Sequence, residues 1–67
     1  MSSSEWQHEL KEANTLYDAK RISRKTYETR VKMAIYMIDK EGDTDIAEKI
    51  SRAHGYSLSA IKNEFSD

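Results

Sequence analysis

Residues that break helices are rare in this chain: proline is absent, and glycine occurs only at positions 42 and 55. Both glycines follow stretches in which apolar residues recur every three or four positions, the spacing of one face of an α-helix. A glycine just beyond such a stretch accepts the left-handed conformation that ends many helices. The pattern therefore predicts helices that stop at Gly42 and Gly55. Strands are not expected, because no segment alternates cleanly and β-branched residues are sparse.

Two longer helices are predicted before Gly42. The first is expected to be capped by Ser4 and to end near Lys20. Its apolar stripe consists of Trp6, Leu10, Ala13, Leu16 and Tyr17. The second is expected from Arg24 to Lys40 after a Ser23 cap, with a main stripe of Tyr27, Val31, Ala34, Ile35 and Ile38 and a second apolar group of Met33, Tyr36 and Met37 on another side. A helix that is apolar on more than one side is normally buried on more than one side, so the second helix is expected to be central.

Two shorter helices are predicted after Gly42. One spans about Asp45 to His54, and the other spans about Leu58 to Phe65 after a Ser57 cap. The residues expected to face inward are Ile46, Ile50 and Ala53 in the first, and Leu58, Ile61 and Phe65 in the second. The fold class that follows is all-α, a compact bundle of three to four short helices.

The chain is short enough to form a single domain over residues 1–67. Residues 4–40 are expected to form a helical hairpin, and residues 43–67 are expected to form a helix-turn-helix-like pair. Residues 1–4, which are mostly serine, are expected to be a frayed end.

The hairpin segment carries a recognisable set of residues around its turn. They are Leu16, Tyr17, Asp18, Ile22, Ser23, Tyr27 and Lys32. With these residues, the segment 10–35 resembles the SHOCT family of short helical hairpins, although Lys20 stands where that family has a turn glycine. The resemblance implies two helices joined by a tight turn, acting as an interaction or oligomerisation module.

The segment 45–65 carries the spacing of a second motif. Its residues are Ile50, Ser51, Gly55, Tyr56 and Ile61. Ser57 is expected to cap the second helix. In this spacing the segment resembles a helix-turn-helix, whose second helix reads DNA. The usual small residue is alanine, and Ser51 replaces it here. The resemblance implies a recognition helix over 58–65, while the plain alternative is two helices separated by a glycine stop.

The charges are segregated along the chain, although the net charge is only −1. Residues 1–19 carry four acidic and one basic side chain, residues 20–32 carry six basic and one acidic, and residues 39–48 carry five acidic and one basic. The cations therefore gather at the hairpin turn, whereas the recognition-like helix offers one lysine and one glutamate. Because DNA affinity comes largely from phosphate neutralisation, this distribution favours protein binding over DNA binding.

Catalysis, metal binding and membrane insertion are not expected. His8 and His54 stand in no metal-binding spacing, and cysteine is absent. No nucleophile elbow or glycine-rich phosphate loop occurs. The longest uncharged apolar run is Met33 to Ile38, far short of a membrane span. We therefore predict a small soluble, cytoplasmic protein without a cofactor or a small-molecule substrate.

The predicted function is that of a small non-catalytic regulatory protein, an inhibitor or adaptor that binds another protein or itself through helical surfaces. The candidate interface residues are Met33, Tyr36, Met37, Lys20, Arg21, Arg24, Lys25 and Lys32. For the three apolar residues the alternative is a place in the core. For the cations it is pairing within the chain or binding of RNA without sequence readout.

The competing prediction is a helix-turn-helix transcriptional regulator that binds DNA as a dimer. Its candidate contacts are Arg52, Ser57, Ser59, Lys62 and Asn63.

Overall fold

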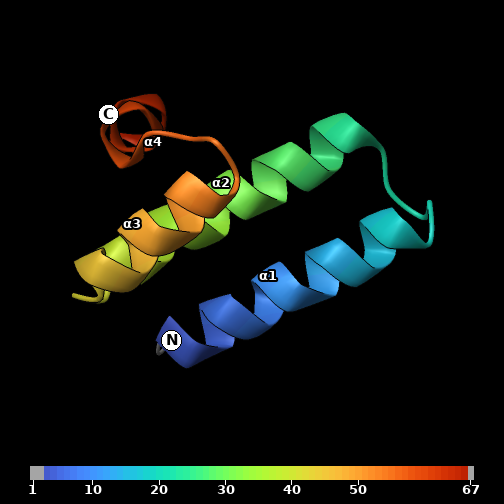
Figure 1. The fold of residues 1–67 in the computed structure, drawn as a ribbon, viewed down its shortest axis with the longest axis horizontal. Coiled ribbons are helices and arrows are strands. Elements are labelled where there is room, and N and C mark those ends of the chain that lie inside the picture. The colour runs from blue at the N-terminus through green and yellow to red at the C-terminus, as the bar shows by residue number, and fades with distance from the viewer. Residues whose placement is uncertain (1–2, 67) are drawn as a thin grey trace.

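The computed structural model describes residues 3–66 and contains four helices in that range (Figure 1). They are α1 (Ser3–Asp18), α2 (Arg24–Lys40), α3 (Thr44–Ala53) and α4 (Leu58–Phe65). No strand occurs among the described residues, so the predicted all-α fold is confirmed. The bounds of α2 and α4 are those expected from the sequence.

The N-terminal prediction needs one correction. The first helix begins at Ser3, so Ser4 lies inside the first turn and is not the cap. The frayed end predicted for residues 1–4 falls partly outside the described residues, because nothing is described for positions 1 and 2. Residue 67, the last of the predicted C-terminal pair, also lies outside them.

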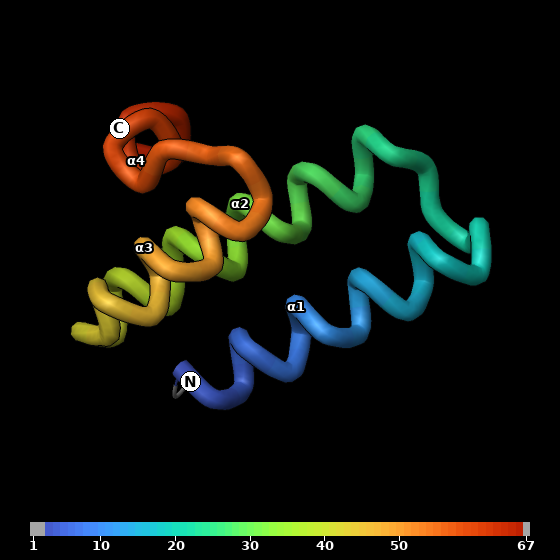
Figure 2. Tube along the Cα trace, viewed as in Figure 1, coloured from blue at the N-terminus to red at the C-terminus, as the bar shows by residue number. Residues whose placement is uncertain are grey.

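Helix α2 lies at the centre of the fold. α1 runs antiparallel to it and packs against α2 alone, whereas α3 and α4 pack against α2 and against each other. Figure 1 shows α4 nearly along its own axis while α3 lies across the view, so the two helices cross steeply. Figure 2 shows the start of α1 near the α2–α3 connection, where the Ser3 hydroxyl donates a hydrogen bond to the Asp43 carboxylate.

The core is built mainly from α2, as its two apolar sides predicted. Four of the buried residues come from this helix: Val31, Ala34, Ile35 and Ile38. Leu10 reaches them from α1, Ala47 from α3 and Ile61 from α4. All the other helices therefore bury their apolar side chains against α2.

The two glycines end helices as predicted. Gly42 (φ +96°) follows α2, and Gly55 (φ +76°) follows α3. After α3, the Tyr56 N–H donates to the Ser51 carbonyl at 2.8 Å and the Gly55 N–H donates to the Arg52 carbonyl at 3.1 Å. This is the Schellman arrangement, which requires a left-handed residue at the glycine position.

The same arrangement ends α1 without a glycine. Lys20 is the only non-glycine residue with positive φ in the described range, at +59°. The Arg21 N–H donates to the Leu16 carbonyl at 2.9 Å, and the Lys20 N–H donates to the Tyr17 carbonyl at 2.9 Å. A lysine therefore holds the hairpin turn in a conformation that glycine adopts at lower cost.

The inward face of α3 differs from the prediction. Ala47 and Ser51 are buried and Ile50 is half-buried, but Ile46 is 36% exposed and Ala53 is exposed. Small side chains at the contact let two helices approach closely, so the larger apolar side chains lie beside the contact instead of within it. For α4 the prediction is confirmed, since Ile61 is buried and Leu58 and Phe65 pack against the core.

Candidate functional site

The three apolar interface candidates on α2 differ in their exposure and contacts. Met33 is 44% exposed. Tyr36 packs against the core, and its ring stacks on Phe65 of α4 with 5.6 Å between centroids. Met37 is half-buried. Tyr36 therefore contributes to the contact between α2 and α4, and Met33 is the side chain that is offered to solvent.

Met33 lies in a groove between α1 and α2. The groove has a volume of about 280 Å³ and is lined by Trp6, Glu9, Arg30, Met33 and Ala34; these five residues are called the Met33 face below. No residue of α3 or α4 lines it. The opposite side of the hairpin is different, because there Ile50 of α3 joins α1 residues such as Leu10 and Lys11 around an open hollow of about 470 Å³.

Trp6 and Ala34 are apolar residues of the groove lining, and Trp6 carries one unsatisfied polar atom. Trp6 packs against the core cluster and Ala34 is buried. The Trp6 Nε1 is buried and has no hydrogen-bond partner among the described residues. A buried donor without an acceptor is unfavourable, typically by about 1–3 kcal/mol.

The walls of the groove carry opposite charges. Glu9 on α1 and Arg30 on α2 are both exposed and both line the groove. The ion pairs found among the described residues do not include either of them. The Met33 face is thus an apolar strip with an acidic wall on one helix and a basic wall on the other.

The basic candidates separate into two groups. Lys20 and Arg21 lie in the hairpin turn, and Arg24 and Lys25 lie in the first turn of α2; all four are exposed. The Arg24 Nε donates to Glu28 Oε1 at 3.2 Å, a pair on the surface of one helix.

Lys32 lies instead on the side of α2 that faces α4. Its Nζ lies 3.4 Å from Glu64 Oε2 and 5.4 Å from the centre of the Tyr56 ring. The structure therefore does not bring Lys32 together with the cations of the turn.

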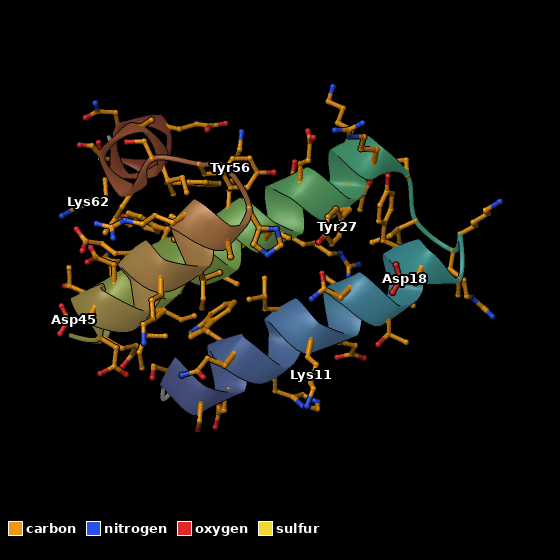
Figure 3. All side chains as sticks on the ribbon, viewed as in Figure 1. Lys11, Asp18, Tyr27, Asp45, Tyr56 and Lys62 are labelled. Atoms are coloured by element: carbon orange, nitrogen blue, oxygen red, sulfur yellow. The ribbon has the colours of Figure 1, made fainter. Side chains whose placement is uncertain are left out.

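The DNA-contact candidates gather around α3 and α4. Arg52, Ser59, Lys62 and Asn63 are exposed, and the Ser57 side chain caps α4 by accepting from the Ala60 N–H at 3.4 Å. Lys62, labelled in Figure 3, places its Nζ 3.4 Å from Asp39 Oδ2. The one lysine of the recognition-like helix is thus paired with a carboxylate of α2.

An aromatic series that the sequence did not predict joins the hairpin turn to the α3–α4 turn. Tyr17 and Tyr27 stack at 4.4 Å, His54 lies 6.3 Å from Tyr27, and Tyr56 lies 6.1 Å from His54. Figure 3 labels two of these rings, Tyr27 on α2 and Tyr56 in the α3–α4 turn. No spacing rule could reveal it, because positions 27 and 54 are far apart in the sequence.

Tyr27 combines its ring contacts with a hydrogen bond to α1. Its hydroxyl donates to Asn14 Oδ1 of α1 at 2.5 Å. Burial is the main cause that raises the pKa of Tyr27 above its ordinary value, and Tyr56, Asp18 and Tyr17 add to it. The series fixes the turn end of the hairpin against the C-terminal pair.

The described residues form neither a metal-binding cluster nor a membrane-spanning helix. Among residues 3–66, no group of three or more His, Asp or Glu side chains is placed to hold a metal ion. No helix in that range is long and apolar enough to cross a bilayer. No protein-family model matches this chain, and neither a curated protein nor a solved structure matches it.

Proposed function

We propose that this chain is a small non-catalytic regulatory protein that acts by protein–protein interaction through the Met33 face. The observation that supports this most directly is the exposure of Met33, 44%, in a groove that Trp6 and Ala34 also line. Methionine adapts its shape to different partners, and tryptophan contributes strongly to many interfaces. A partner helix or loop that covers the groove would bury both side chains.

The unsatisfied indole adds a reason for a partner. Trp6 lines the groove and its Nε1 has no partner among the described residues, so a partner whose acceptor reached this atom would supply a hydrogen bond that the free chain lacks. Binding would then remove both an exposed apolar side chain and a buried unsatisfied donor. An inhibitor or an adaptor needs only such a surface.

The test compares two matched substitutions. Met33→Glu places a charge in the groove, and Ile46→Glu places the same charge at the other exposed large apolar side chain, on α3. A tagged chain is used to capture partners from its native cells, and the captured proteins are identified by mass. We expect the partner to be retained by the Ile46 variant and lost with the Met33 variant. Retention by the Met33 variant, or equal loss with both, would reject the Met33 face.

A second candidate function is DNA binding, favoured by the arrangement of α2, α3 and α4. α4 crosses α3 after a glycine turn, is capped by Ser57, and exposes Ser59 and Asn63. Helices α3 and α4 carry three acidic and three basic side chains, and Lys62 is paired with Asp39, so the attraction to phosphate is weak. Titration of labelled duplex DNA at low and moderate salt tests this function: salt-sensitive binding that Arg52→Ala abolishes would support it, and no binding at low salt would exclude it.

A further inference from the structure

We infer that the partner of the Met33 face in the free protein is a second copy of the same chain. This inference rests on the proposed function, because it concerns the same face and names what covers it. The evidence is the distribution of charge over that face, which is complementary to itself.

The acidic wall extends along α1. Glu5 and Glu12 lie one turn before and one turn after Glu9, and side chains at these spacings share one side of a helix. All three are exposed. No ion pair found among the described residues includes them. α1 therefore presents a column of three carboxylates beside the apolar strip.

The basic wall extends along α2. Arg30 lies one turn before Met33, and Lys40 lies two turns after it on the same side; both are exposed. The Lys40 Nζ lies 5.3 Å from the centre of the Tyr36 ring, which packs against Phe65 of α4, so Arg30 is the cation that lines the groove. The hairpin thus carries carboxylates on α1 and Arg30 on α2 beside the groove that Trp6 and Met33 also line.

A two-fold axis parallel to the helices converts this pattern into a complementary contact. Such an axis places α1 of one copy over α2 of the other and keeps each residue at its height along the axis. Glu9 and Arg30 line the same groove of about 280 Å³ and so lie at similar heights. Each Glu9 therefore faces the Arg30 of the other copy, in two equivalent pairs, as an isologous interface requires. The apolar strips meet at the centre, giving four helices packed around Trp6 and Met33.

The consequence for the proposed function is competition. A second copy covers Met33 in the free protein, so any other protein that binds this face must displace it. The Met33 face then becomes available for another protein only when the dimer dissociates.

The test exchanges the two charges. Glu9→Arg and Arg30→Glu are made as separate chains, and molar mass is measured by sedimentation equilibrium up to about 1 mM. We expect the wild-type mass to rise from monomer to dimer with concentration. Each variant alone should dissociate at least tenfold more readily, because like charges oppose each other in both pairs. An equimolar mixture should form the heterodimer, since both pairs again join opposite charges. Far-UV circular dichroism checks that each exposed substitution leaves the helices intact.

Three outcomes would overturn the inference: a wild-type chain that stays monomeric, single variants that dimerise like the wild type, or a mixture that fails to associate. None of these decides the proposed function, which depends on whether Met33→Glu abolishes partner capture. A monomeric chain that still loses its partner through that substitution rejects the second copy and retains the Met33 face. A capture experiment that Met33→Glu leaves unchanged rejects the face itself.

Discussion

The two sides of α2 are held in different ways. On one side, α2 is the one helix against which α1 packs. The Tyr27–Asn14 hydrogen bond is the polar link between these two helices, and Ser3 bonds to Asp43 just beyond the end of α2. On the other side, α3 and α4 also pack against each other, and two ion pairs, Lys32–Glu64 and Lys62–Asp39, tie α4 to α2. The C-terminal side therefore pairs both charged residues of α4 with α2, whereas Glu9, Arg30 and Met33 on the α1 side face outward. A binding surface is expected where the chain has not already covered it.

The largest expected loss of stability comes from truncating a side chain in the core that both sides of α2 share. Ile35 is fully buried in the core cluster, and Ile35→Ala is expected to lower the free energy of unfolding by about 2–5 kcal/mol. Urea denaturation followed by circular dichroism measures it. Met33→Ala, on the same helix, is the control and should change the stability by less than about 0.5 kcal/mol. Equal losses would mean that Met33 is part of the core.

The next effect concerns the α1 side alone. Tyr27→Phe removes the hydrogen bond to Asn14 and is expected to cost about 0.5–1.5 kcal/mol. The same urea experiment at neutral pH measures this cost. A variant as stable as the wild type would show that the bond contributes nothing to the attachment of α1.

The stability that Tyr27 contributes is expected to depend on pH. Burial first, then Tyr56, Asp18 and Tyr17, raise the pKa of Tyr27 in the folded chain. The folded state then holds this proton more tightly than the unfolded state, whose tyrosines ionise near pH 10. The contribution of Tyr27 is complete below about pH 10 and is lost as the pH rises through the folded pKa. The stability of Tyr27→Phe should therefore fall less between about pH 9 and about pH 11 than that of the wild type, and an equal fall would contradict the prediction.

The hairpin turn and the α3–α4 turn should respond in opposite directions to substitution. Lys20→Gly relieves a left-handed lysine and is expected to raise the stability by about 0.5–1 kcal/mol. Gly55→Ala introduces the same kind of strain and should lower it by about 1 kcal/mol. Thermal unfolding of the two variants beside the wild type gives both signs. Two changes of the same sign would show that factors other than backbone conformation decide these turns.

The smallest effect is expected on the C-terminal side. Ser51 is 1% exposed, and its hydroxyl donates to the Ala47 carbonyl of the same helix at 2.8 Å. Ser51→Ala should change the stability by no more than about 0.5 kcal/mol, because alanine fits the space and favours the helix. Urea denaturation measures it, and a loss above about 1 kcal/mol would reveal another partner for the hydroxyl.

Much of the fold could be predicted from the backbone requirements of a few residues. Gly42 and Gly55 marked two helix ends, and the two apolar sides of α2 marked the centre. The predicted face of α3 was right for Ile50, which packs against the core, and wrong for Ile46 and Ala53, which are exposed while Ala47 and Ser51 are buried. Counting large apolar residues favours Ile46 over these small side chains. How near two helices come depends on both partners, and one helix read alone does not contain that information.

The candidate site was predicted only in part, for a related reason. Met33 was recognised as surplus to one apolar stripe, but Trp6, Glu9 and Arg30 were not assigned to the same place. Their meeting depends on which turn of α1 lies beside which turn of α2. That register is set by the hairpin turn. Its left-handed residue is Lys20 and not a glycine, so the sequence does not indicate where the left-handed conformation occurs.

The open space around the two glycines has a chemical consequence. A Cβ built on Gly42 or Gly55 meets no atom within 4 Å, so positive φ alone restricts these positions. Residues of the opposite chirality adopt positive φ as readily as ordinary residues adopt negative φ. D-Alanine at either position would therefore keep the helix end and reduce the freedom of the unfolded chain. A chain of 67 residues is open to total chemical synthesis, so its turns can be made more rigid with mirror-image building blocks without altering any surface that binds.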